Sequence, residues 1–166
     1  NIKIIYNDIK VKKLLGQKNI LFSQPENISA VFYPVLFIDG DIQNFNENVF
    51  YQKWTEVTIK NELINFILPL EDLEDISRII EMKNTIEDLN IDLLINKYDV
   101  KNYVFALMDY QNKELNIHLK TNFNNNKISK NILYDVNNIN DQSTLNSILI
   151  DLKLIIIDLW KEENLI

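Results

Sequence analysis

Residues 63–76, LINFILPLEDLEDI, contain the pattern from which the fold is predicted. The stretch begins with a short apolar run, residues 63–68, whose β-branched and aromatic members are typical of a strand buried on both faces. Pro69 has no backbone N–H and therefore ends the strand. The acidic residues that follow favour a helix N-terminus, where unpaired N–H groups and the helix dipole attract negative charge. A strand that leads directly into a helix is the building unit of an α/β domain.

Two further apolar runs, residues 30–38 and 100–108, predict strands that lie beside the first in a common sheet. Pro34 interrupts one of them, and this predicts either a bulge or an N–H side that faces no partner strand. Periodic apolar residues predict helices between the strands. One begins at Asn46 or Asn48 and ends near Trp54, and the others cover residues 72–82 and the segment from the capping-box residue Thr85 to Tyr98.

The C-terminal third predicts an antiparallel meander and a final helix. Residues 114–121 alternate, with Leu115, Ile117 and Leu119 on one face, and residues 128–134 follow after an asparagine turn. Ser143 is expected to cap a helix over residues 144–161, which its charged residues exclude as a membrane span. The predicted fold class is α/β, with α+β as the alternative: a mixed β-sheet with βαβ units, a C-terminal antiparallel meander and a covering C-terminal helix.

Length and charge restrict the class of protein. The 166 residues suit a single domain, and the net charge of −7 provides no basic stripe for phosphates. We therefore expect no nucleic-acid binding and no insertion of this segment into a membrane. Asn1 is not an initiator methionine and leads into a predicted strand over residues 2–6, followed by a helix over residues 9–15. The chain is accordingly expected to be a fragment of a longer protein.

The motifs for chemistry are weak. His118, the only histidine, falls on the predicted solvent face of a strand, and a solvated side chain is favoured over a catalytic or metal-binding one. Glu71, Asp72, Glu74 and Asp75 are interpreted as helix N-terminal charge, with a metal cluster or an acid/base pair as the alternative. No glycine-rich phosphate loop or nucleophile elbow is present. We expect neither a catalytic site nor a cofactor nor a metal.

Two binding hypotheses remain, with an enzyme as a third. The first is a non-catalytic domain that binds another protein through a strand edge. The second is a small-ligand domain with a pocket beyond the carboxyl ends of the strands. The candidate ligand or partner surface consists of Asp39, Asp41, Trp54, Glu71 and Asp72. For Trp54, a structural place in the core is favoured over a place in a ligand pocket.

Four blocks in order carry a resemblance to a known family: YNDIKVKKLL at residues 6–15, FYPVLFI at 32–38 with Trp54 downstream, FILPLEDLEDI at 66–76 and LWKEENL at 159–165. Together they resemble an uncharacterised family of exported bacterial proteins, found mainly in alphaproteobacteria and known as domain of unknown function 2066. The resemblance implies an upstream signal peptide, a location in the periplasm or cell envelope, and an envelope protein as partner. The family has no established activity, so the resemblance implies no functional residues.

Overall fold

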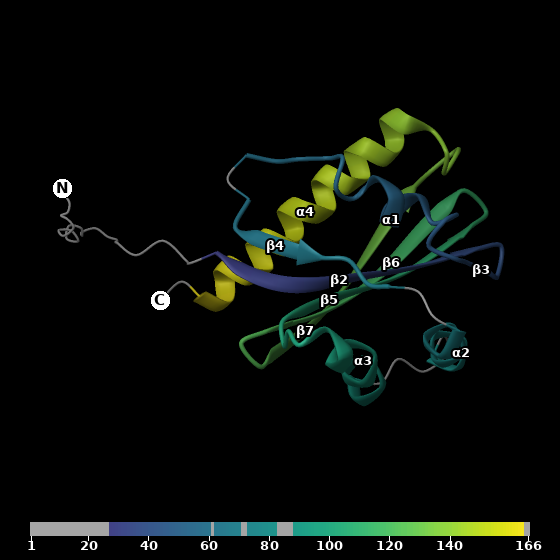
Figure 1. Cartoon of the computed structure of the whole chain (residues 1–166). Helices are drawn as coiled ribbons and strands as arrows, with labels where there is room; N and C mark the ends of the chain where they lie inside the picture. The colour runs from purple at the N-terminus through teal and green to yellow at the C-terminus, as the bar shows by residue number, and fades with distance from the viewer. Residues whose placement is uncertain (1–26, 61, 71–72, 83–87, 165–166) are drawn as a thin grey trace. The chain divides into compact units, whose positions relative to one another are not determined.

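The computed structural model describes residues 27–60, 62–70, 73–82 and 88–164. Among them, Ile28–Glu163 form one compact unit, in which a six-stranded sheet is packed between helices (Figure 1). The strand predicted over residues 2–6, the helix over 9–15 and the capping box at Thr85 lie outside the described residues.

The central strand of the sheet is β2 (Ile28–Ile38), which has neighbours on both sides. On one side it pairs in parallel with β5 (Tyr103–Gln111) over its last eight residues. On the other side, β4 (Ile64–Ile67) pairs in parallel with its first four residues, and the short β3 (Asp41–Gln43) pairs antiparallel with its last three. The three apolar runs therefore lie side by side, as predicted.

The antiparallel meander continues from β5 through β6 (Glu114–Phe123) to β7 (Asn126–Asp135). Each hairpin turns on two residues with positive φ, first Asn112 and Lys113 and then Asn124 and Asn125. Two successive residues in this conformation make a type I′ turn, whose twist matches that of the flanking strands. The mixed sheet, the meander and the long C-terminal helix confirm the predicted fold class.

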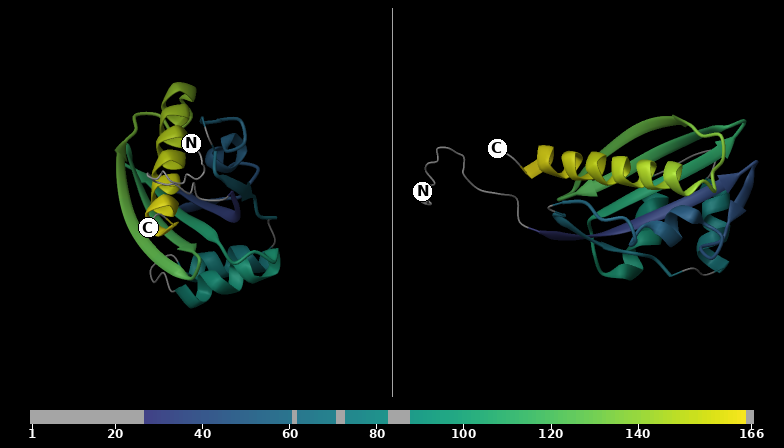
Figure 2. Two further views of the ribbon diagram at one scale, coloured as in Figure 1. Left: turned by 90° about the vertical axis from the view of Figure 1, so that its left-hand side faces the viewer. Right: turned by 90° about the horizontal axis from the view of Figure 1, so that it is seen from above.

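Helices cover the two faces of the sheet in separate groups. α4 (Gln142–Asn164) and the short α1 (Val49–Lys53) lie on one face, and α2 (Leu73–Met82), α3 (Asp88–Ile95) and the 3-10 turn η1 (Asn96–Tyr98) lie on the other (Figures 1 and 2). Alternate residues of β2 consequently belong to different cores, with Phe32 on the α4 side and Tyr33 on the α2–α3 side. β2 is thus the strand that is buried on both faces.

The prediction that residues 63–68 form a strand buried on both faces was wrong. β4 is only four residues long, and among the described strands it pairs with β2 alone. Its Ile64 is buried, but Asn65 is exposed and the next two residues are half-buried. Side chains alternate between the faces of a strand, so Asn65 and Ile67 share one face; Ile67 packs against the α2–α3 core there, whereas Asn65 is exposed to solvent.

Pro34 occupies the one stretch of β2 that lacks a neighbour on the β3–β4 side. The Val31 N–H donates to Asn102 O on the β5 side, so the backbone of Pro34, three residues on, points the opposite way. There β4 has already ended and β3 has not begun. The second of the two alternatives predicted for Pro34 is therefore confirmed, because the missing N–H faces no partner strand among the described residues.

The helix predicted from Asn46 or Asn48 is α1, and Asn48 is its N-cap. The cap predicted for the final helix was wrong. α4 begins at Gln142, and Asp141 Oδ2 accepts hydrogen bonds from Thr144 N and Oγ1 at 3.0 and 2.7 Å. A carboxylate interacts with the helix dipole more favourably than the Ser143 hydroxyl would, so the helix starts earlier.

Candidate functional site

Within the described residues, β7 is an edge strand of the sheet. It is ten residues long, and among the described residues only β6 pairs with it. At the opposite edge, the described strands are β3 and β4, of three and four residues, which are too short to pair with much of another strand. Figure 2 shows β7 at the outer margin of the curved sheet. It is the longest strand edge of the described part of the chain.

The backbone of β7 alternates between its two sides. The N–H of Val136 donates to Lys113 O at 2.8 Å, so even-numbered positions point toward β6 and odd-numbered positions point outward. The outward-pointing residues are Lys127, Ser129, Asn131, Leu133 and Asp135, and all five side chains are exposed. Each presents an N–H and a C=O to the edge, where a further strand could bond to them.

A groove of about 620 Å³ lies between the end of β7 and the N-terminal half of α4. Its apolar lining includes Ile150 and Leu154, which are 40% and 48% exposed although they are large hydrophobic residues. Three hydroxyl side chains of α4, Ser143, Thr144 and Ser147, form its polar part. The volume lies within the range of roughly 300–1,000 Å³ that is usual for binding sites.

A hydrogen bond fixes one wall of this groove. The hydroxyl of Tyr134 donates to Asp151 Oδ2 at 2.5 Å and links β7 to α4. Partial burial, together with the hydrogen bond to Asp151 and its negative charge, raises the pKa of Tyr134 well above its usual range. The hydroxyl therefore keeps its proton, and the hydrogen bond connects β7 to α4 at this wall of the groove.

A second, smaller cavity of about 180 Å³ lies beside Trp54 and Lys153. The Lys153 side chain is only 4% exposed; its Nζ donates to Val57 O at 2.6 Å, lies 3.4 Å from Glu62 Oε1 and 4.8 Å from the centre of the Trp54 ring. Trp54 stacks on Phe32 with ring centroids 3.6 Å apart. The buried indole N–H of Trp54 has no acceptor among the described residues.

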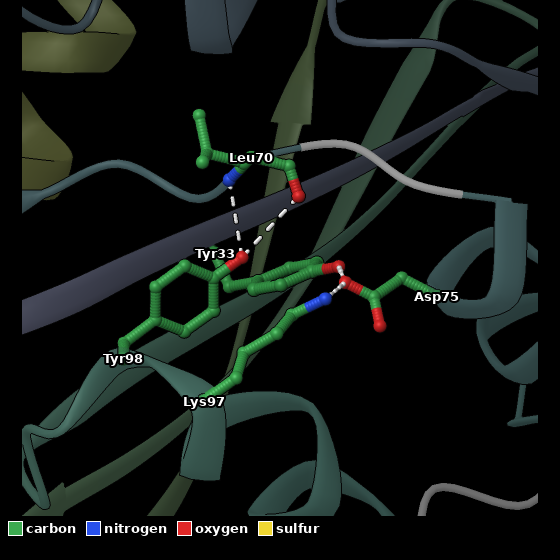
Figure 3. A network of polar contacts seen from close by, with 5 residues as sticks. All are labelled: Tyr33, Leu70, Asp75, Lys97 and Tyr98. Carbon is green, nitrogen blue, oxygen red and sulfur yellow. Dashed lines mark hydrogen bonds and ion pairs between the residues drawn. The ribbon is translucent and has the colours of Figure 1, made fainter.

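A polar network centred on the buried Asp75 holds α2 and η1 against β2 (Figure 3). Asp75 Oδ2 accepts a hydrogen bond from the Tyr33 hydroxyl at 3.2 Å and lies 2.6 Å from Lys97 Nζ. The neighbouring Tyr98 hydroxyl accepts from Leu70 N and donates to Leu70 O. The adjoining cavity measures only about 10 Å³, which is room for no more than one water. This network is a structural clamp rather than a binding site.

The structure does not bring the described residues of the predicted surface together. Asp39, in the turn between β2 and β3, and Asp41, the first residue of β3, are exposed, whereas Trp54 is 1% exposed and stacked on Phe32. Phe32 and Asp39 are seven strand residues apart, which is roughly 20 Å or more. Glu71 and Asp72 lie outside the described residues.

Other residues considered for chemistry are placed as follows. His118 is half-buried on β6, on the face opposite α4, between Leu107 and Asn131 of the neighbouring strands. Asp75 is not a solvated helix-start charge but a buried member of the clamp. No group of three or more potential metal ligands occurs among the described residues. No helix in the described ranges has the length and apolar character needed to span a membrane.

Sequence reasoning missed the β7 edge and the burial of Asp75, and a signal existed for each. The final strand of a meander has a partner on one side only unless another segment returns to it, and the helix that follows residues 128–134 does not. Asp75 precedes the buried Ile79 by four residues, so the two share one helix face. Comparisons with protein-family models, curated proteins and solved structures found no match to this chain.

Proposed function

We propose that this chain is a non-catalytic domain that binds another protein through β7 and the groove between β7 and α4. The observation that carries the proposal is the ten-residue edge strand, whose outward backbone groups lie beside exposed apolar side chains. An added strand would satisfy the backbone groups of the edge, and its side chains would cover Ile150 and Leu154. This is the recognition mode in which main-chain hydrogen bonds supply affinity and a neighbouring groove supplies specificity.

The location of the partner is part of the same proposal. The resemblance to exported bacterial proteins favours the cell envelope or periplasm, and hence an envelope protein as partner. Charge also bears on the choice, because the described lining of the groove includes Asp135 and Asp151 and contains no basic residue. A partner segment with a basic residue at its end would complement this lining.

Affinity purification from the native cell tests the proposal when variants are compared quantitatively. The double variant Ile150→Asp/Leu154→Asp should lose a partner that the wild-type chain retains. The control Ile80→Asp changes a side chain of similar exposure on α2, on the other side of the sheet, and should retain it. Addition of the purified partner should then slow hydrogen exchange at the outward amides of β7. Equal recovery with all three proteins would overturn the proposal.

A second candidate function, small-ligand binding, is favoured by one specific observation. The cavity is lined by Trp54 and by Lys153, whose side chain is buried, and the buried indole N–H of Trp54 has no acceptor among the described residues. An unsatisfied buried donor costs about 1–3 kcal/mol, so a ligand oxygen placed there would gain that energy. A small molecule with a carboxylate or hydroxyl oxygen suits this environment.

Tryptophan fluorescence tests the second candidate, because the chain has only two tryptophans. In a Trp160→Phe variant the emission reports on Trp54 alone. Titration with acetate or glycine should change it with a saturable curve, and Lys153→Met in the same background should abolish that change. A linear response to both probes, equal in the two variants, would count against a site in this cavity.

A further inference from the structure

We infer that the protein bound by β7 is a second copy of this chain, an inference that rests on the proposed protein-binding function. The two copies join edge to edge, with their β7 strands antiparallel about a twofold axis at Asn131. An isologous contact of this kind uses the same surface on both copies and closes on itself. The argument rests on the direction of the backbone groups, on the charges along the edge and on the apolar residues next to it.

Backbone direction restricts the register. Two antiparallel strands exchange hydrogen bonds only between residues whose backbone groups point at one another. On β7 those are the odd-numbered positions, from Lys127 to Asp135. A twofold axis at Asn131 engages all of them, because Lys127 then faces Asp135 of the second copy and Ser129 faces Leu133. An axis at Ser129 or Leu133 would leave several outward groups without partners.

Charge favours the same register. Within one chain Asp135 lies directly opposite Glu114 on β6, and like charges in such a pair are destabilising. In the dimer, Lys127 of the second copy lies opposite Asp135; its Nζ also lies 3.0 Å from Asp92 of its own chain, so it adds positive charge beside Asp135 and Glu114 while keeping that ion pair. Twofold symmetry gives this contact twice. Lysines on an edge strand usually discourage pairing, but here Lys127 opposes an acid in one register and therefore selects it.

The apolar side chains complete the surface. The even-numbered residues of β7 point toward α4, and this register places Ile128 opposite Tyr134 of the second copy, at the margin of the groove. A twofold axis perpendicular to the sheet keeps both α4 helices on the same face, so the second copy approaches the exposed Ile150 and Leu154. The product is a continuous sheet of twelve described strands with two α4 helices side by side.

Sedimentation equilibrium measures the assembly directly. The wild-type chain should have about twice its mass of 19.7 kDa. Asn131→Pro removes the outward N–H at the axis and should yield monomers, whereas Asn131→Ala keeps that N–H and should remain dimeric. Circular dichroism establishes that each variant is folded. A wild-type monomer at tens of micromolar would overturn the inference.

Cysteine cross-linking tests the register without relying on a proline, since the chain contains no cysteine. Facing residues in a hydrogen-bonded pair have Cα atoms about 5.5 Å apart, within the range of a disulfide. Asn131→Cys should therefore form a covalent dimer on mild oxidation. Ser129→Cys should not, because the two copies of residue 129 are about 13 Å apart along the strands. Equal cross-linking of both would contradict the register.

A charge exchange provides the final test. Asp135→Lys places lysine opposite Lys127 of the second copy twice, and Lys127→Asp places two acids together, so each variant alone should dimerise about tenfold more weakly. An equimolar mixture of the two should restore dimers, because each Lys–Asp pair is re-formed across the axis. If all proteins are monomeric but wild type still retains a partner that Ile150→Asp/Leu154→Asp loses, self-association fails while the proposed function stands. If wild type is monomeric and also retains no partner that the double variant loses, both the dimer and the proposed function are wrong.

Discussion

Asn48 donates a hydrogen bond from its side-chain amide to the backbone carbonyl of Pro34, at 3.3 Å. The oxygen of the same amide accepts the N–H groups of Phe50 and Tyr51 at 3.0 and 3.1 Å. One fully buried side chain therefore caps α1 and also bonds to the central strand where neither β3 nor β4 reaches it. Local helix formation and sheet structure are coupled through this residue.

Asn48→Ala should destabilise the protein by about 2–4 kcal/mol. The loss of an N-cap costs about 1 kcal/mol, and a buried carbonyl left without a donor costs about 1–3 kcal/mol more. Urea unfolding followed by circular dichroism measures the change. Asn48→Asp keeps the cap oxygens but loses the donor to Pro34, so it separates the two contributions. A loss below about 0.5 kcal/mol in both variants would show that the contact is unimportant.

Pro34→Ala should destabilise the protein by about 1–3 kcal/mol, although proline is usually unfavourable in a strand. Alanine restores a buried N–H on a side of β2 where no described strand pairs with it, and it also increases the freedom of the unfolded chain. The free energy of unfolding in urea is the measurement. Val35→Ala is a matched control for loss of side-chain volume at the next buried position of β2. A stabilised Pro34→Ala variant would contradict our account of the gap.

Asp75→Ala should cost about 2–3 kcal/mol, because it deprives the Tyr33 hydroxyl and Lys97 of their common buried acceptor. Lys97→Ala should cost less, since the Lys97 side chain is 38% exposed and its charge is screened by solvent. A double-mutant cycle measures the coupling between them. Additive effects of the two substitutions would mean that the 2.6 Å ion pair contributes nothing to stability.

Asp141 makes the stability of α4 dependent on pH. Its hydrogen bonds to the side chain and backbone of Thr144 lower the pKa of Asp141 below its usual value. A lowered folded-state pKa contributes stability above the unfolded-state pKa of about 4 and loses it as the pH falls. The stability difference between wild type and Asp141→Ala should therefore shrink between pH 6 and pH 3, as measured by thermal unfolding. Thr144→Val should reduce this pH dependence.

Apolar patterning was sufficient to predict the main strands, the meander and the covering helix, because burial on one or both faces of an element determines the spacing of its apolar residues. Patterning did not predict which strand is central. Residues 63–68 and 30–38 look alike as apolar runs. Only their different lengths and the exposed Asn65 distinguish the short strand β4 from the central strand β2. Polar burial was less predictable still, because Asp75 and Lys153 are stabilised by partners distant in sequence.

The candidate site depended on information that a single strand does not contain. Residues 128–134 were correctly predicted as a strand, but whether a strand is an edge depends on every other segment that could pair with it. The groove beside it depends further on where α4 crosses the sheet. The predicted surface around Asp39 and Trp54 joined a residue of an exposed turn to a residue of the core, because the order of elements along the sequence does not give the distances between them in space.

Pro34 also affects the tendency of the newly synthesised chain to aggregate before it has folded. β2 emerges from the ribosome about seventy residues before β5, the strand whose Tyr103 pairs with Val31 of β2. Until then AVFYPVLFI is an exposed apolar run of the kind that stacks into intermolecular fibrils. We expect the proline to act as a gatekeeper during this interval, since it blocks strand stacking at a position where the native sheet requires no N–H. Faster aggregation of Pro34→Ala during refolding would be the direct sign of that protection.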